Sequence, residues 1–292
     1  MRFRGLSLLI LAIALLFGLP SAVVYYTDWL WFGEVGYQSV FLRTLNAQSA
    51  VFGATFGLVF VFLYLNLRIA RRTPGRPHVV LGTGPDGRPI SLEGRRLAGL
   101  ALWVSLGLAT ILAWSAADHW LMWLSFFNAA PFGDKDPLFG RDIAFYVFRL
   151  PVWQAVRQQA LLSVFLALVG CGLYYVLSGS FIIESRPGTG FWPKVRLVPS
   201  ARRHLALLAA LIFGLMAWGS WLDLPQTMLT QAGVIFGASY ADVHARIPFI
   251  WITLVVLALG AGLAIVYGFG RRVWPLAAAV ALYAVVSLAG GV

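Results

Sequence analysis

The stretch Asp118–Arg157, which reads DHWLMWLSFFNAAPFGDKDPLFGRDIAFYVFRLPVWQAVR, separates two long apolar runs of the chain. It is polar enough to lie outside lipid, yet its many aromatic side chains are unsuited to a solvated linker. We therefore expect residues 118–159 to form an amphipathic loop that lies on the surface of a membrane. Placing this loop on one side of a bilayer determines the side on which every other segment lies.

The composition indicates an integral membrane protein. Hydrophobic residues make up 60% of the 292 residues and charged residues 11%, whereas soluble domains have about 45–50% and about 25%. The single cysteine, Cys171, lies inside an apolar run, so the sequence provides no disulfide framework.

Seven apolar runs without charged residues each have about the twenty residues that a helix needs to cross a bilayer. Only a helix or a closed barrel satisfies the backbone in hydrocarbon, so we expect helices. Pro20 stands where signal-peptide cleavage requires a small residue, which favours a retained first helix. The predicted fold is an all-α, polytopic transmembrane helix bundle with short interfacial helices on its outer face. The predicted spans are residues 5–26, 49–67, 97–117, 160–183, 205–222, 249–268 and 273–292.

The distribution of basic residues predicts the orientation. The segments that lie on the same side as the N-terminus, residues 1–4, 68–96, 184–204 and 269–272, contain sixteen of the 22 Lys and Arg. The positive-inside rule places this side in the cytoplasm and the C-terminus outside. We therefore assign the formal charge of +11 to topology and to anionic lipids on the cytoplasmic face, and expect no nucleic acid as a partner.

Two loops show further local patterns. Residues 68–96 form a cytoplasmic loop rich in Gly and Pro, in which Val79–Leu81 and Pro89–Leu92 fit a short hairpin. In the outer loop, Asp136 followed by Pro137 predicts the start of a short helix, and Pro151 predicts its end or a kink near Leu150.

The sequence offers little for catalysis or cofactor binding. Asp134 and Asp136 form a weak candidate site for a divalent cation, with a solvated, capped loop as the alternative. His119 near Asp118 and His244 near Asp242 fit interfacial hydrogen bonding better than a catalytic pair, because no nucleophile accompanies them. We predict no catalytic residues, cofactor or firm metal site, and lean against an enzyme.

Three longer blocks resemble a known group of bacterial membrane proteins. They are Thr27–Tyr37 (TDWLWFGEVGY), Asp136–Tyr146 (DPLFGRDIAFY) and Gly233–Arg246 (GVIFGASYADVHAR). The sequence is identified through them as similar to uncharacterised protein family 0182, over essentially its whole length. This resemblance implies a seven-helix N-terminal membrane region followed by a large extracytoplasmic domain. It implies no established activity and no catalytic residues.

A repeated pattern suggests that the first six helices are three copies of one hairpin. In each copy an aspartate near aromatic residues is followed by a Phe-Gly pair and then by an arginine nine or ten residues after the glycine. Chance is the alternative explanation, since Phe and Gly are both abundant. The residues of this structural outer-face motif are Asp28, Phe32, Gly33 and Arg43; Asp118, Phe139, Gly140 and Arg149; and Asp223, Phe236, Gly237 and Arg246.

We expect a multi-pass protein of the cell membrane that serves as a platform, anchoring an extracytoplasmic domain or an envelope partner. The alternative is a membrane-embedded transferase or lipid-handling enzyme with a carboxylate site on the outer face. A transporter ranks third, because the predicted spans contain no charged residue. The platform and the enzyme differ in one testable feature: an enzyme needs several outer carboxylates to converge beside a cleft, whereas a platform uses them as caps and interface pairs.

Overall fold

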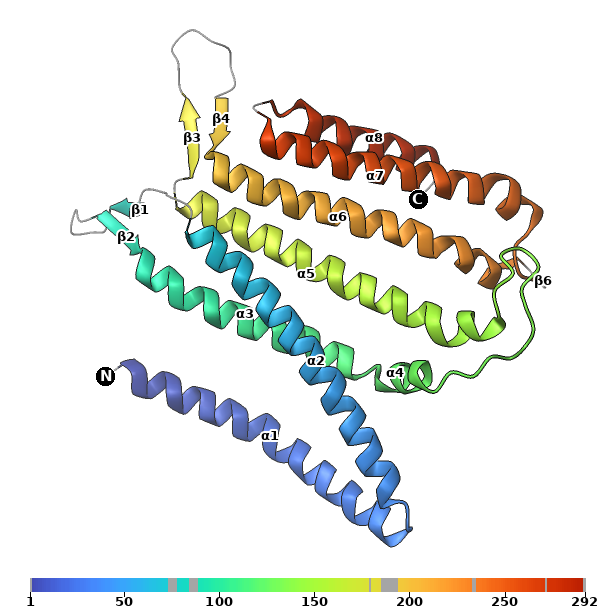
Figure 1. Cartoon of the computed structure of the whole chain (residues 1–292). Coiled ribbons are helices and arrows are strands. Elements are labelled where there is room, and N and C mark those ends of the chain that lie inside the picture. Colours follow the sequence, from blue (N-terminus) through green and yellow to red (C-terminus); the bar gives the residue numbers. More distant parts are fainter. Residues whose placement is uncertain are drawn as a thin grey trace.

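The protein is a bundle of long helices, as the computed structural model in Figure 1 shows. The structure describes residues 2–72, 78–83, 89–178, 180–184, 194–232, 235–270 and 272–290. The long helices are α1 (Arg2–Glu34), α2 (Gln38–Arg71), α3 (Gly94–Ala117), α5 (Leu150–Leu177), α6 (Pro199–Gln226), α7 (Ile247–Phe269) and α8 (Trp274–Gly290). The predicted all-α class is therefore confirmed.

Short elements lie between the long helices. They are the helix α4 (Trp120–Phe127), the π-helical segments η1 (Phe145–Arg149) and η3 (Asp242–Arg246), and the 3-10 turn η2 (Thr227–Leu229). Among the residues that the structure describes, three antiparallel two-stranded hairpins pair β1 (His78–Thr83) with β2 (Pro89–Glu93), β3 (Phe181–Glu184) with β4 (Lys194–Leu197), and β5 (Gln231–Ala232) with β6 (Ile235–Phe236). The hairpin predicted in the loop 68–96 is confirmed, with Val79 opposite Leu92.

Within the described residues, five helical segments are long and apolar enough to cross a membrane. They are Gln38–Arg71, Gly99–Ala117, Phe145–Leu177, Pro199–Leu229 and Asp242–Phe269. The helix α8 is apolar but shorter, with 17 residues. The helices extend beyond several of the predicted spans; α2, for example, begins at Gln38 rather than near residue 49. The last two residues of the predicted range 273–292 lie outside the described residues.

The helices α5, α6, α7 and α8 lie side by side, and α2 crosses between α3 and α5 (Figure 1). One apolar core joins α2, α3, α5 and α6 and includes Leu63, Ala109, Cys171 and Leu208. A second core joins α6, α7 and α8 around Phe213 and Leu257. By contrast, α1 and α2 diverge from their shared turn, where the rings of Phe32 and Phe41 lie 5.6 Å apart.

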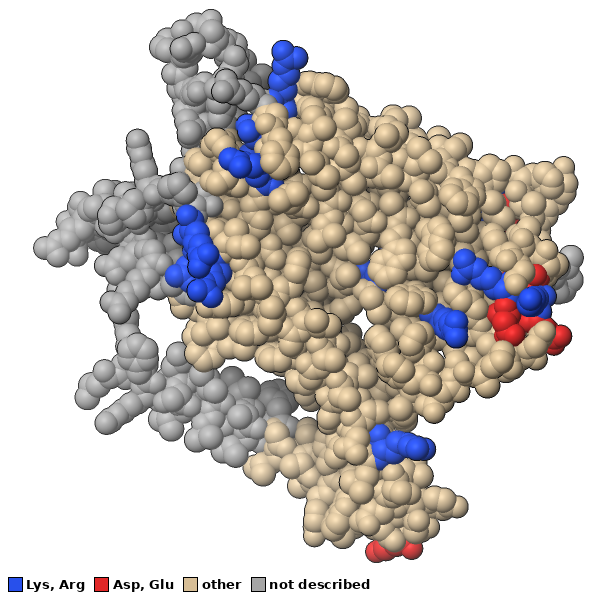
Figure 2. Space-filling model, in the orientation of Figure 1, with Lys and Arg blue, Asp and Glu red and all other residues tan. Residues whose placement is uncertain are grey.

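The segments predicted on one side of the membrane also lie at one end of the bundle. Residues 118–142, 227–232 and 235–241 are at the right of Figure 1, and the turn at residues 35–37 is at the bottom, right of the centre; we call these together the loop end. The hairpins β1–β2 and β3–β4 and the turn before α8 are at the left, and we call this the basic end. On the face shown in Figure 2, acidic side chains are visible only toward the loop end and the tip of α1 and α2.

The prediction that a short helix starts at Asp136–Pro137 is wrong. Residues 137–139 form a turn, and the helix starts at Ile143 and continues through η1 into α5. The prediction that Pro151 ends this helix near Leu150 is also wrong, because the helix continues to Leu177, and the alternative, a kink there, stays a prediction. A proline normally disrupts the helical turn before it, but here that turn is the wider π turn of η1, in which the Leu150 N–H donates to the Phe145 carbonyl five residues earlier.

Candidate functional site at the loop end

Asp136 organises the outer loop by accepting hydrogen bonds from the backbone around it. Its carboxylate accepts from the N–H groups of Leu138 at 2.9 Å, of Phe139, and of Arg141 at 2.7 Å, and from the Tyr146 hydroxyl at 2.9 Å. The residue is only 8% exposed. Burial alone raises the pKa of this carboxyl, but the four hydrogen bonds outweigh burial and lower the pKa below its ordinary value.

Asp142 takes the capping role that the sequence assigned to Asp136. Its carboxylate accepts from the Ala144 N–H at 2.8 Å, and its backbone carbonyl accepts from the Phe145 N–H at 2.9 Å, so it caps the helix that begins at Ile143. The same carboxylate also accepts from the N–H groups of Phe132 and Gly133. These hydrogen bonds, first that of Ala144, lower the pKa of Asp142. Asp136 and Asp142 together thus hold the backbone of the loop from residue 132 to residue 144.

The start of α7 is capped by a different pair of side chains. The Ser239 hydroxyl accepts from the Asp242 N–H at 3.2 Å, and the Asp242 carboxylate accepts from the Ser239 N–H at 2.9 Å and hydroxyl at 2.7 Å. This reciprocal arrangement is a capping box with Asp in place of Glu. Arg246 forms an ion pair with the same carboxylate at 3.5 Å. Asp242 is therefore held by backbone and neighbouring groups, like Asp136.

The starts of α5 and α7 share a local structure that the start of α2 lacks. Gly140 and Gly237 have positive φ angles of 65° and 116°, and each precedes a helix that contains a five-residue π segment ending in arginine. A proline then follows as the second residue of each α-helix. At the first predicted copy, Gly33 is helical and Gly36 has the positive φ, 77°. Arg43 lies within α2, with no π segment before it. The three-copy repeat stays a prediction.

The other aspartates of the predicted motif lie apart. Asp28 is on the exposed side of α1, where it lines a hollow of about 200 Å³ with Gln48 of α2. Asp118 is exposed in the turn after α3. Asp223 is on α6, and the positive charges of Arg157 and Arg246 lie near its carboxylate. These three described aspartates thus lie on separate parts of the bundle, on α1, after α3 and on α6.

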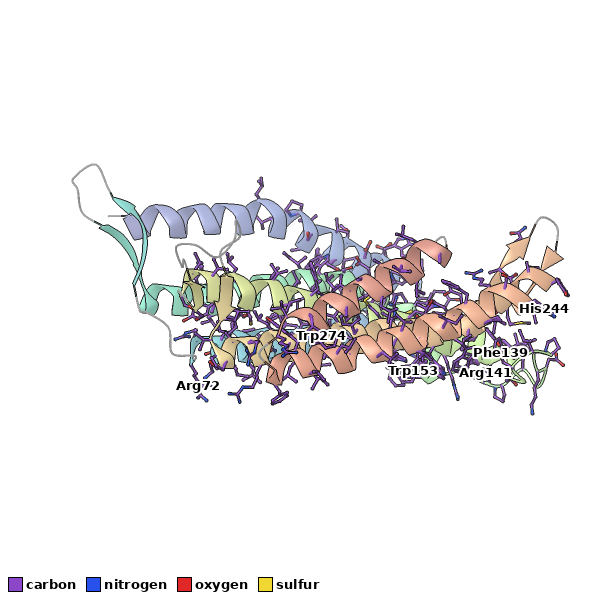
Figure 3. The ribbon with its side chains drawn as sticks, turned by 90° about the horizontal axis from the view of Figure 1, so that it is seen from above. Arg72, Phe139, Arg141, Trp153, His244 and Trp274 are labelled. Atoms are coloured by element: carbon purple, nitrogen blue, oxygen red, sulfur yellow. The ribbon has the colours of Figure 1, made fainter. Side chains whose placement is uncertain are left out.

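Arg141 attaches the outer loop to the helices. The Arg141 guanidinium lies 4.3 Å from the Phe145 ring centre and 5.4 Å from that of Trp221 on α6. Figure 3 shows Phe139 and Arg141 at the same end of the molecule as Trp153 and His244, and Arg72 at the other. Nothing in the sequence indicates this contact between Arg141 and Trp221, because the two residues are far apart along the chain.

The two histidines near aspartates make local contacts. The His119 Nδ1 lies 3.0 Å from the Ser115 carbonyl, and the His244 Nδ1 lies 3.0 Å from the Tyr240 carbonyl. The His244 ring also stacks on Tyr240, with ring centres 3.9 Å apart. Neither contact resembles a His-carboxylate pair arranged for proton transfer.

The weak metal candidates Asp134 and Asp136 differ in their surroundings. The Asp136 oxygens already accept four hydrogen bonds, whereas the Asp134 side chain is exposed. Within the described ranges, no group of three or more His, Cys, Asp or Glu side chains is arranged to hold a metal ion. The geometry gives the loop a structural role through its backbone.

At the opposite end, the structure brings together three polar side chains that the sequence places far apart. The Tyr175 hydroxyl lies 2.8 Å from His204 Nδ1, and His204 Nε2 lies 3.0 Å from Asn66 Oδ1. The Asn66 amide donates to the Phe62 carbonyl, which leaves Oδ1 to accept from His204. The hydrogen bonds therefore favour the neutral His204 tautomer with its proton on Nε2. The sequence showed only that Asn66 and His204 are near span ends.

Comparison with known proteins identifies the family. The model of the Uncharacterised protein family (UPF0182) matches residues 5–292. The chain belongs to this family. It is similar to UPF0182 proteins of Moorella thermoacetica (36% identical over 255 residues, covering 85% of this chain and 27% of the relative), Geobacter sp. strain M21 (34% over 276 residues, 93% and 30%) and Mycobacterium avium strain 104 (36% over 255 residues, 85% and 24%).

The members of UPF0182 named above are much longer than this chain, which spans less than a third of their length. No solved structure matches the chain. The apolar helices are compatible with a membrane protein, and the family is uncharacterised.

Proposed function

We propose that the chain is the membrane platform of a UPF0182 protein, which anchors and orients an extracytoplasmic domain or an envelope partner. The observation that carries this proposal is the use of the loop-end carboxylates. Asp136, Asp142 and Asp242 bond to backbone N–H groups and fix the starts of helices. A surface built in this way is rigid, which suits the positioning of a partner.

In this proposal seven helices cross the cell membrane, with the basic end in the cytoplasm and the loop end outside. The number of spans follows from adding α1 and α8 to the five long apolar segments. The orientation rests on the excess of Lys and Arg in the segments of the basic end. The greater length of the relatives supports the presence of further protein beside the platform.

A lipid-handling enzyme is the second candidate, because the charges of Arg157 and Arg246 lie near the Asp223 carboxylate. Together these residues carry both charges needed to bind and activate a phosphate-containing substrate. The scatter of the other carboxylates favours the platform over this enzyme. A transporter ranks third: Tyr175, His204 and Asn66 form a polar network between helices, but the network joins the helices at one end.

The experiment is complementation in a host that lacks its own copy of the gene. Asp28, Asp118, Asp134 and Asp223 are replaced one at a time by Asn in the full-length protein, and membrane levels are measured beside growth. A platform predicts that all four variants complement. Loss of complementation by a variant present at normal levels in the membrane supports the enzyme and contradicts the platform.

A further inference from the structure

An open hollow lies where α7 ends and α8 begins. It has a volume of about 510 Å³ and is lined by Tyr267 of α7 and by five apolar residues of the next segment, Val273, Leu276, Ala277, Val280 and Ala281. This volume lies within the range of about 300–1,000 Å³ that is usual for small-molecule sites. The lining is apolar apart from the tyrosine hydroxyl, so an apolar ligand chain suits it.

Two arginines lie beside the hollow at the basic end. Arg202 of α6 donates from Nε to the Gly268 carbonyl at 3.3 Å, which places it next to Tyr267 of the lining. Arg272 is exposed and directly precedes Val273. Within the part of the chain that the structure describes, neither arginine forms an ion pair with a carboxylate. Their positive charge is thus available to an anion.

The end of the bundle around these arginines has a positive charge overall. Four more described arginines lie where α2 ends and α6 begins: Arg68, Arg71, Arg72 and Arg203. Trp274, which is 58% exposed, begins α8 beside the hollow and lies between Arg72 and Trp153 in Figure 3. An exposed tryptophan at such a position is typical of the boundary between lipid and water.

We propose that this hollow binds one anionic phospholipid, with an acyl chain against Leu276 and Val280 and the phosphate between Arg202 and Arg272. Guanidinium groups bind phosphate oxygens with good geometry and carry their charge at any physiological pH. The apolar lining distinguishes a lipid from free phosphate, and the charge distinguishes an anionic lipid from a zwitterionic one. The site depends on insertion of the bundle in a membrane and not on the platform function.

The test is native mass spectrometry of the purified full chain, supplied with phosphatidylglycerol, phosphatidylcholine or inorganic phosphate. We expect one phosphatidylglycerol to be retained in preference to phosphatidylcholine, and phosphate alone not to displace it. Replacing Arg202 and Arg272 together by Gln should remove this preference, with about a fivefold loss of retention for each arginine. Val280→Trp, which fills the hollow, should reduce retention of both lipids.

Two matched variants serve as controls. Arg203→Gln removes a neighbouring arginine that bonds to the Pro199 carbonyl of its own helix. Val285→Trp adds the same bulk to α8 at a residue that is 64% exposed and does not line the hollow. Both should retain phosphatidylglycerol like the unchanged protein.

Three results would overturn the proposal: equal retention of the two lipids by the unchanged protein, displacement of the lipid by phosphate, or equal effects of Arg203→Gln and the double variant. If the double variant loses its helical circular dichroism, Arg272→Gln alone and Val280→Trp decide the question.

Discussion

The two ends of the bundle are held together in different ways. At the loop end, the partners of Asp136 lie within ten residues of it along the chain. At the basic end, the partners of His204 lie 29 and 138 residues away, on two other helices. The hydrogen bonds that hold the Asp136 loop are therefore local, and Arg141 over Trp221 joins that loop to α6. The basic end instead depends on correct packing of α2, α5 and α6. A substitution at Asp136 should therefore disturb mainly its own loop, whereas a substitution at His204 or its partners should disturb several helices.

The largest effect is expected at Tyr175, whose side chain is fully buried. Tyr175→Ala removes a large ring from the core of α2, α3, α5 and α6, at a cost of about 3–5 kcal/mol in the free energy of unfolding. Tyr175→Phe keeps the ring and loses the bond to His204, which costs about 1 kcal/mol. Unfolding titrations in detergent measure both. Equal effects of the two variants would show that ring packing contributes little here.

Asp136→Asn should cost about 1–3 kcal/mol, because it replaces a charged acceptor of four hydrogen bonds with a neutral amide. Hydrogen exchange should accelerate in residues 132–146 and stay unchanged around His204. The matched control is Asp134→Asn, two residues away and exposed, which should change stability by less than about 0.5 kcal/mol. Faster exchange around His204 in Asp136→Asn would contradict local stabilisation of the loop end.

Glycine substitutions should affect the loop before α5 and the loop before α2 differently. Gly140→Ala forces a positive φ on a residue with a Cβ and should cost about 1–2 kcal/mol. Gly33→Ala lies in a helix, where a Cβ meets only ordinary contact with Gln38 at 3.7 Å, so it should be neutral or stabilising. Thermal unfolding of the two variants measures the difference. A cost at Gly33 equal to that at Gly140 would indicate that the first loop also depends on its Phe-Gly pair.

Acid should weaken the loop end gradually. The pKa values of Asp136 and Asp142 are lower in the folded protein than their ordinary values. Their stabilisation is thus fully present above about pH 4, the usual range of a free Asp, and is lost as the pH falls through the folded pKa values. Exchange in residues 132–146, corrected for intrinsic pH dependence, should accelerate below about pH 4. In Asp136→Asn the same change should be smaller; an unchanged acid response would assign it to other groups.

The same contrast explains which features could be predicted from the sequence. The helices follow from uninterrupted apolar runs, and the hairpin β1–β2 follows from turn residues between short apolar segments. The cap was assigned to Asp136 because Pro137 favours a first helical turn, yet Asp142, six residues on, holds that position. A local rule can name the residue type and still miss the residue.

Contacts between residues far apart along the chain could not be predicted from local sequence patterns. Nothing in the sequence around Asn66 or His204 indicates that two helices bring them within 3.0 Å. The π segments were also missed, because their signal is a proline that follows an arginine by two residues at both helix starts. That pattern is informative only after the structure shows that Arg149 and Arg246 occupy equivalent positions.

The orientation of the bundle is the central claim, and cysteine labelling tests it most directly. Cys171 is buried, so single cysteines can be placed at Lys135 of the loop end and at Arg72 of the basic end. A thiol reagent that does not cross membranes is added to intact cells and, separately, to permeabilised cells. The platform predicts that Lys135→Cys reacts in intact cells and that Arg72→Cys reacts only after permeabilisation. Reaction of Arg72→Cys in intact cells, with Lys135→Cys protected, would contradict it.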